Sequence, residues 1–422
     1  MGANIFEKYT EILKRELIPA TGCTEPIALA LAAAQGRKLL GDVPDAVSAY
    51  VSGSIIKNVK SVIVPNTNGM KGIEAAIAAG ITVGDPDREL EVLSQVGENA
   101  VAQIGAYLER ECIHVYLADT QESFDILLVM RSGENESKIR IAGHHTNIVL
   151  LESNGEVLLD RQDTLVSAVD QQDIHMSIAE IYDYACNCDL AQIAPVIERQ
   201  IELNSALSQA GLDGEWGAQI GRILLKSDPD DVLTRAKARA AAGSDARMSG
   251  CQLPAVINSG SGNQGLTITM AVLEYAQTLQ VSHERLVRGL IFANLAAIRI
   301  KKEIGCLSAY CGAVCAGCAA GAGIAFLHGE NQSFLEHTIV NSLAILSGTI
   351  CDGAKPSCAA KIAMSVEAGM MGYEMAKHGT EFVGGDGIIK KGIENTIAQI
   401  GTLGRVGMVQ TNETVLNIML KG

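Results

Sequence analysis

The feature that most constrains this chain is a change of hydrophobic period near residue 170. Before that point, runs such as "CIHVYLAD", "FDILLVMRS" and "SKIRIAGHH" alternate apolar and polar residues, and "SGEN" and "SNGE" are turn signals between such runs. After it, stretches such as "LAQIAPVIERQIELNSALSQAG" show the three- and four-residue spacing of helices. We therefore expect an α+β protein: a mixed α/β domain over 1–170 with a small, largely antiparallel sheet, then an α-helical domain over 171–422.

The length of 422 residues also favours two domains rather than one core. The 43 glycines and many alanines predict closely packed helices with small residues where they cross. The β-branched stretch 46–65 is predicted to form strands or a hairpin. In the first domain, helices are predicted over 5–18, 26–40, 71–80 and 97–110.

The charge pattern narrows the range of partners. The net charge is −15, and no stretch is rich in Lys and Arg, so we expect neither nucleic acid nor a membrane as a partner. The first 17 residues form an amphipathic pattern without the features of a signal peptide, and apolar stretches are interrupted before they could span a bilayer. We expect a cytoplasmic protein, and the long Ala- and Gly-rich helical half is compatible with a homodimer.

Four Gly- or Asn-rich loops stand beside predicted helix starts. Helix N-termini present unpaired N–H groups that suit carboxylates or phosphates. No loop matches GxxxxGK[ST], and although "GSGNQG" (260–265) has the letters of GxGxxG, such a match alone is weak, so nucleotide binding is disfavoured, which leaves a glycine-assisted helix start or a cradle for a small anion. Ser259, Ser261 and Asn263 are the best candidates for such a carboxylate cradle. The loops are "TGCTEP" (21–26), "PNTNGMKG" (65–72), "NSGSGNQG" (258–265) and "CDGAKPSC" (351–358).

The 11 cysteines do not form a disulfide framework, since their number is odd and the chain is large. Cys311, Cys315 and Cys318 have helical spacing, and we expect one ligand at the helix start with the others as packing. Cys351 and Cys358 flank a loop that runs into a helix, where thiolates can converge. Thiolates select zinc or iron–sulfur, and the paired CxxC spacing of structural zinc is absent. An iron–sulfur cluster held by three cysteines fits better.

Three motifs in this order, "TGCTEP", "GCLSAYCG" and "ICDGAKPSC", resemble the L-cysteine desulfidase family, which is distantly related to the iron–sulfur L-serine dehydratases. The resemblance covers nearly the whole chain, and "VINSGSGNQG" is similar to the substrate loop of the dehydratases. It implies a [4Fe–4S] cluster on Cys311, Cys351 and Cys358 with one iron left open. It implies that Cys23 is the proton acceptor, with a ligand role in place of Cys358 as the alternative.

The implied function is a non-redox β-elimination that converts L-cysteine to hydrogen sulfide, ammonia and pyruvate. An open iron is a Lewis acid that helps the leaving group depart, and a Cys23 thiolate is the base if a helix N-terminus, the cluster or Lys57 lowers its pKa. The interval of 7 between Cys351 and Cys358 favours this reaction over L-serine dehydration by the same machinery, whose family has a longer interval. A pyridoxal phosphate enzyme and a non-catalytic iron–sulfur sensor protein are the rival classes.

Two charged residues are further candidates for contacts with the small amino-acid substrate. Glu25 either caps the helix that starts at Pro26 or binds the substrate ammonium. Lys57, in "GSIIKNVK", is either a solvated charge on a strand or a partner for a carboxylate.

The loop residues leave the same choice between structure and function. Asn66 and Asn68 either form turns or bind substrate. His144 and His145, in "GHHTN", lie exposed or in the core, or one of them touches the active site.

Overall fold

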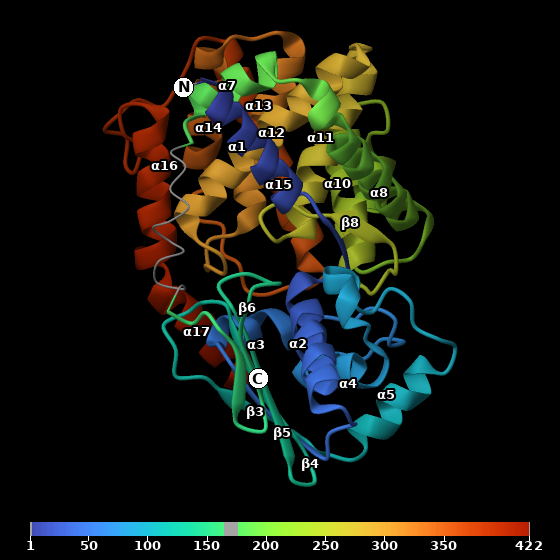
Figure 1. Ribbon diagram of the computed structural model, residues 1–422. Coiled ribbons are helices and arrows are strands. Elements are labelled where there is room, and N and C mark those ends of the chain that lie inside the picture. Colours follow the sequence, from blue (N-terminus) through green and yellow to red (C-terminus); the bar gives the residue numbers. More distant parts are fainter. Residues whose placement is uncertain (1, 164–175, 422) are drawn as a thin grey trace.

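The computed structural model describes residues 2–163 and 176–421 and confirms the predicted α+β class. Figure 1 shows a mixed α/β body, coloured blue to teal, beneath a body built of helices. Each body has its own cluster of buried apolar side chains. The predicted domain boundary at residue 170 lies outside the described residues.

The sheet of the α/β body has six strands in the order β3-β2-β4-β5-β6-β7. β2 and β3 are parallel, and every other neighbouring pair is antiparallel, which agrees with the largely antiparallel sheet expected from the alternating runs. The strands are β2 (Ala46–Val51), β3 (Ile113–Leu117), β4 (Asp125–Ser132), β5 (Asn135–Ala142), β6 (Ile148–Ser153) and β7 (Glu156–Asp160).

Helix α2 is buried between the sheet and helix α4. Gly36 lets α2 approach β4, since a Cβ there would lie 2.9 Å from Sδ of Met130. On the other side, a Cβ at Gly80 of α4 would lie 2.2 Å from the Ala30 carbonyl oxygen, so the two helix backbones are nearly in contact. The helices of this body are α2 (Thr24–Leu40), α3 (Gly53–Val59), α4 (Gly72–Val83), η1 (Pro86–Glu91) and α5 (Ala100–Leu108).

The prediction that 46–65 forms strands or a hairpin is wrong beyond Val51, because the chain turns into helix α3. The Ser52 hydroxyl caps this helix by accepting a hydrogen bond from the Ile55 amide at 3.4 Å. Ile55 and Val59, four residues apart, share the buried face of the helix. A short β-branched run fits both periods, and here the cap and the buried face favour the helix.

The helical body packs through small residues, as its composition predicts. A Cβ at Gly317 of α13 would lie 2.2 Å from the Ser365 carbonyl oxygen, and one at Gly369 of α15 would lie 2.2 Å from that of Gly317. The helices are α7 (Ile178–Asn187), η2 (Leu190–Gln192), α8 (Ala194–Asp213), α9 (Ile220–Ser227), α10 (Val232–Met248), α11 (Gly262–Leu279), α12 (His283–Ile304), α13 (Gly312–His328), α14 (Gln332–Leu346), α15 (Ser357–Lys377), α16 (Ile393–Thr402) and η3 (Leu403–Gly407).

Three segments connect the two bodies. Helix α1 (Gly2–Glu16) packs into the helical body, whereas α17 (Val409–Lys421) lies against α3 of the α/β body (Figure 1). Strand β1 (Pro19–Thr21) pairs with β8 (Pro254–Val256) in a two-stranded antiparallel sheet. None of the described helices is long and apolar enough to cross a membrane.

Candidate active site

The start of helix α2 places a cysteine at the junction of the two bodies. Gly22 adopts a left-handed φ of 69°, and a Cβ there would lie 2.7 Å from Cγ of Pro65, so the turn requires glycine. Cys23 follows as the N-cap residue of α2 with an extended backbone. Its side chain does not cap the helix. It points instead to the carboxylate in the first turn.

Glu25 is the centre of a buried hydrogen-bond network. The Cys23 thiol donates to Oε2 of Glu25 at 2.9 Å, and the Asn58 side-chain amide donates to Oε1 at 3.1 Å. The Thr24 hydroxyl lies 3.3 Å from Oε2 of Glu25 and 2.8 Å from the Gly260 carbonyl oxygen, which belongs to the glycine-rich loop of the other body. The four side chains are therefore fixed relative to that loop.

The protonation of this pair differs from the expected thiolate. Burial raises the pKa of the Cys23 thiol well above its usual value, the Glu25 carboxylate raises it further, and Arg247 lowers it without offsetting burial. Burial also raises the pKa of Glu25, but His145, the Cys23 thiol, a backbone amide and Arg247 outweigh it, so that pKa is lowered. The proton therefore lies on sulfur, and Glu25 is the charged member.

His145 and Arg247 face two glycines of the loop before α11. A Cβ at Gly260 would lie 2.6 Å from Cε1 of His145, and one at Gly262 would lie 2.3 Å from Nε of Arg247. Burial lowers the pKa of His145 to about 4 although Glu25 opposes this shift, and the ring packs at 4.6 Å on the Phe124 ring. Both side chains are more than nine-tenths buried.

The predicted carboxylate cradle has other hydrogen-bond partners. The Ser261 hydroxyl caps α11 by accepting from the Gln264 amide at 3.4 Å. Ser259, with a left-handed φ of 49°, donates to Oδ1 of Asn258 at 2.9 Å. Asn263 alone is linked to the site, because its Oδ1 accepts from an Nη of Arg247 at 3.2 Å.

The two asparagines of the "PNTNG" loop have turn geometry. Asn66 and Asn68 have φ values of 62° and 55°. Asn66 donates to the Leu93 carbonyl oxygen at 2.5 Å, and Asn68 is exposed. Neither forms a hydrogen bond with Cys23 or Glu25 within the described residues, although the neighbouring Pro65 contacts Gly22.

Lys57 is not the solvated strand charge that one interpretation of the sequence expected. It lies on helix α3 and is 1% exposed. Its Nζ donates to Oδ1 of Asn412 at 2.6 Å and to the Cys351 carbonyl oxygen at 3.3 Å. Burial lowers the pKa of this amine, while Cys351 and Glu25 act in the opposite direction. Lys57 therefore lies between the two cysteine motifs.

The cysteines of the second motif come together through a short backbone bridge. Tyr310 and Ile350 pair antiparallel, and the Cys351 amide donates to the Ala309 carbonyl oxygen at 2.7 Å. Cys311 follows as the N-cap residue of α13. Cys358 lies in the first turn of α15. The loop between them is pressed on α3, since a Cβ at Gly353 would lie 2.4 Å from the Lys57 carbonyl oxygen.

The three thiols of Cys311, Cys351 and Cys358 influence one another. Burial raises the pKa of Cys311 to about 12, with further contributions from Cys351 and Cys358, and burial raises the pKa of Cys358, with Cys351 as a further cause. Cys315 and Cys318, in contrast, are fully buried within α13. No cysteine of the described chain forms a disulfide.

The spread of the candidate ligands bears on the kind of metal group that they could hold. In the described part of the chain, no three His, Cys, Asp or Glu side chains lie close enough to hold one metal ion. A four-iron cluster takes each thiolate at a separate corner and so accepts ligands that are spread further apart. Asp352 forms ion pairs with Lys355, at 2.5 Å, and with Lys361, so both lysines that a pyridoxal phosphate enzyme would use here are engaged.

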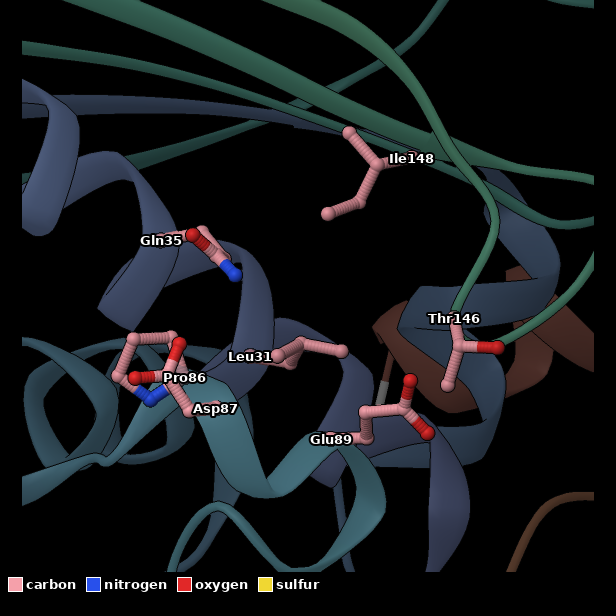
Figure 2. Close-up of a pocket in the computed structure, with 7 residues that line it drawn as sticks. All are labelled: Leu31, Gln35, Pro86, Asp87, Glu89, Thr146 and Ile148. Carbon is pink, nitrogen blue, oxygen red and sulfur yellow. The ribbon is translucent and has the colours of Figure 1, made fainter.

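A surface pocket lies on the α/β body beside this site. Its volume is about 270 Å³, and it lies between α2, η1 and the loop before β6 (Figure 2). Leu31, Glu89 and Thr146 are among its lining residues. No predicted site residue lines it, although Thr146 directly follows His145.

Sequence reasoning missed two residues that the fold brings to Cys23. Arg247 lies on α10, in "AAAGSDARM", and Asn58 on the segment mistaken for a strand. The only local signal was an arginine in the last turn of an Ala-rich helix. Arg247 is only 3% exposed, although arginines on helices normally reach solvent.

Comparison with known proteins gives a consistent picture. The family described as serine dehydratase alpha chain matches residues 87–417, a span that includes Cys311, Cys351 and Cys358. A UPF0597 protein of Desulfitobacterium hafniense (strain Y51) is 52% identical over 98% of this chain and 97% of the relative. One of Finegoldia magna is 49% identical over 98% and 100%, and one of Vibrio campbellii is 37% identical over 98% and 99%.

Proposed function

Since this chain belongs to the family of the serine dehydratase alpha chain, as its motifs predict, we propose that it is a lyase that eliminates hydrogen sulfide from L-cysteine. The family match supports serine dehydratase-like chemistry, and the desulfidase activity is our inference from the cysteine motifs. The Cα proton leaves to a base, its electron pair forms the Cα=Cβ bond, and sulfur departs with the C–S pair. Aminoacrylate then tautomerises and takes up water to give pyruvate and ammonia, so no external oxidant or reductant is needed.

One observation carries the proposal: two consecutive residues of α3 reach both cysteine motifs. Asn58 donates to Glu25, the partner of Cys23, and Lys57 donates to the backbone of Cys351. An elimination needs a base on one side of the substrate and leaving-group assistance on the other. Adjacent residues of helix α3 therefore contact the candidate base pair, Cys23 and Glu25, and the loop of Cys351, which is the candidate for leaving-group assistance.

In this proposal Cys23 and Glu25 move the proton. At rest the proton lies on sulfur, since the pKa of Cys23 is raised and that of Glu25 is lowered. In the proposed complex the ammonium of the bound amino acid lies nearer to sulfur than to Glu25, so it lowers the pKa of the thiol more than that of the carboxyl. Glu25 then accepts the thiol proton over 2.9 Å, and the Cys23 thiolate removes the proton from Cα.

Cys311, Cys351 and Cys358 would hold a [4Fe–4S] cluster. When bound by three cysteines, such a cluster supplies a Lewis-acidic iron that favours departure of the substrate's sulfur. The chain supports this loop through its own groups: Lys57 holds the Cys351 carbonyl, and Asp352 pairs with two lysines. Cys311 is buried, whereas Cys351 and Cys358 are half-buried.

The test is anaerobic purification followed by analysis of iron and acid-labile sulfide and by assays with L-cysteine and L-serine in parallel. We expect about four irons per chain, as for one [4Fe–4S] cluster. We expect sulfide and pyruvate from L-cysteine. Cys23→Ala retains iron and loses turnover by about 10²- to 10⁴-fold, the usual contribution of a general base. Cys351→Ala loses the iron.

The matched control is Cys318→Ala, because Cys318 is buried in α13, seven residues from Cys311, and lies outside the proposed ligand set. It should retain iron and turnover. Loss of iron in Cys23→Ala makes Cys23 a ligand in place of Cys358. A higher kcat/KM for L-serine would assign the dehydratase reaction, which the family description favours. Iron without turnover of either amino acid would leave the sensor alternative.

A further inference from the structure

Five buried polar atoms without a hydrogen-bond partner lie on segments that meet around Cys23. They are Oγ1 of Thr21, Oδ1 of Asn58, Nε2 of His145, Nε of Arg247 and Oε1 of Gln264. An unpaired buried polar atom usually costs about 1–3 kcal/mol, so such atoms are rare in a folded core. Their concentration around one thiol indicates a place for a polar ligand.

Arg247 is the member with the largest unmet demand. It is 3% exposed, and it forms no ion pair among the described residues. Its hydrogen bond to Asn263 uses one of the five donors of a guanidinium. A guanidinium taken out of water with a single neutral acceptor is unfavourable unless an anion joins it.

The surroundings increase this demand. Nε of Arg247 lies against Gly262, the first residue of the 18-residue helix α11, where the helix dipole is positive. Lys57 and Lys301 are also buried, and the hydrogen bonds of each go to carbonyl or amide oxygens. Glu25 is the carboxylate that acts most strongly on Cys23. The site therefore has an excess of positive charge.

The unpaired groups divide into two kinds. His145 and Arg247 present nitrogens and face Gly260 and Gly262 of one loop, so they are held side by side. Asn58, which bonds Glu25, presents an unpaired oxygen. In the tautomer that carries its proton on Nε2, His145 donates beside Arg247, and these donors together with the acceptor oxygen of Asn58 match the carboxylate and the ammonium of a zwitterion.

We infer that Arg247 and His145 bind the carboxylate of the ligand, so that this site takes amino acids with a free carboxylate and rejects their amides. This rests on the proposed function in that the ligand is an α-amino acid. Arg247, on α10, thus takes the carboxylate-binding role that the sequence analysis predicted for Ser259 and Ser261. Arg247 offers Nε and an Nη in the fork that suits a carboxylate.

The experiment measures binding without turnover. Anaerobic titration calorimetry of the purified protein compares L-alanine, which has no leaving group, with L-alaninamide, in wild type, Arg247→Gln, Arg247→Lys and His145→Gln. We expect Arg247→Gln to bind L-alanine about 10- to 100-fold more weakly, as for loss of a charge-assisted pair. We expect the affinity of Arg247→Lys for L-alanine to lie between those of wild type and Arg247→Gln. Wild type should bind L-alanine more tightly than L-alaninamide. In Arg247→Gln this preference disappears.

The control is Arg235→Gln on the same helix, since Glu274 retains Arg239 at 2.8 Å. It should bind L-alanine as wild type does, and thermal unfolding with iron content checks that each variant is folded. Equal binding of L-alanine by Arg247→Gln and wild type, equal binding of acid and amide by wild type, or no binding at all overturns the inference. Parallel assays separate the two ideas. Arg247-dependent binding without elimination overturns only the proposed function, and turnover of L-cysteine with an unchanged KM in Arg247→Gln overturns only the inference.

Discussion

The thiol of Cys23 lies 2.9 Å from Oε2 of Glu25, and each partner shifts the protonation of the other. The carboxylate raises the pKa of the thiol, and the thiol's hydrogen bond lowers the pKa of the carboxyl. The pair is thus poised with its proton on sulfur and an acceptor in direct contact. A charged ligand can shift that balance without any movement of the backbone.

Glu25→Gln tests whether this carboxylate accepts the proton. The variant keeps the shape of the side chain but removes its basicity, so we expect kcat to fall by about 10²-fold with iron content unchanged. Steady-state kinetics with L-cysteine checks the result. A raised KM with unchanged kcat would instead assign Glu25 to the substrate ammonium, and unchanged kinetics would leave it as a structural part of the helix start.

Lys57→Met tests the connection between α3 and the cysteine loop. Removing the amine breaks its bonds to Asn412 and to the Cys351 carbonyl, while the aliphatic side chain still fills the buried space. We expect iron loss in air to accelerate about tenfold, the effect of roughly 1.4 kcal/mol. Decay of the cluster's visible absorbance measures it. Lys60→Met, an exposed lysine just beyond the same helix, is the control, and equal decay in both variants would rule out this role.

Gly353→Ala tests the contact of the loop with α3. The residue has a left-handed φ of 94°, and a Cβ there would lie 2.4 Å from the Lys57 carbonyl oxygen. Strain of this kind costs about 1–3 kcal/mol, so the loop should shift and the iron content should drop. Gly348→Ala, where a Cβ meets no atom within 4 Å, should leave iron unchanged. Full iron content in Gly353→Ala contradicts the predicted contact.

Buried His145 predicts a loss of stability in mild acid. Burial lowers its pKa from the ordinary value of 6.5, which the unfolded chain retains, to about 4 in the folded protein. The unfolded chain therefore binds more protons between these two pH values, and the free energy of unfolding falls as the pH drops from 6.5 to 4, by up to about 3 kcal/mol. Urea unfolding at several pH values across this range measures how the free energy of unfolding changes with pH. We expect His145→Gln to remove this pH-dependent loss, of up to about 3 kcal/mol.

The control for this slope is His144→Gln, because His144 is the neighbouring residue and its side chain is exposed. It should retain the slope of wild type. Comparing slopes rather than absolute stabilities separates the protonation of His145 from any packing defect in the variants. A slope in His145→Gln equal to that of wild type would refute the assignment.

The sequence predicted what depends on local pattern. The alternating runs before residue 160 form strands, and the cysteine motifs stand at helix starts because glycine and small residues beside an apolar run define such starts. The prediction for 52–59 failed because a short β-branched run fits both the strand and the helix period, and here the Ser52 cap and the buried face favour the helix.

The remaining site residues depend on long-range packing. Arg247 is 224 positions from Cys23 (247 − 23), and no local pattern shows that β1 pairs with β8 to bring their segments together. The sequence also could not predict that the pKa of Cys23 is raised. A helix N-terminus, visible in sequence, lowers a thiol pKa, whereas burial and Glu25 oppose it. Burial is a property of the assembled fold.

The exchange of end helices between the two bodies has a consequence for biosynthesis. Tyr9 of α1 needs Glu180 of the helical body, and Lys57 of α3 needs Asn412 of α17. The α/β body can therefore not complete its contacts before α17 is synthesised, whereas α1 is made first and waits for the helical segments that follow. Lys57 of the early α/β segment must wait for residues 351 and 412 before its amine has both partners, so these long-range contacts form late in the synthesis of the chain.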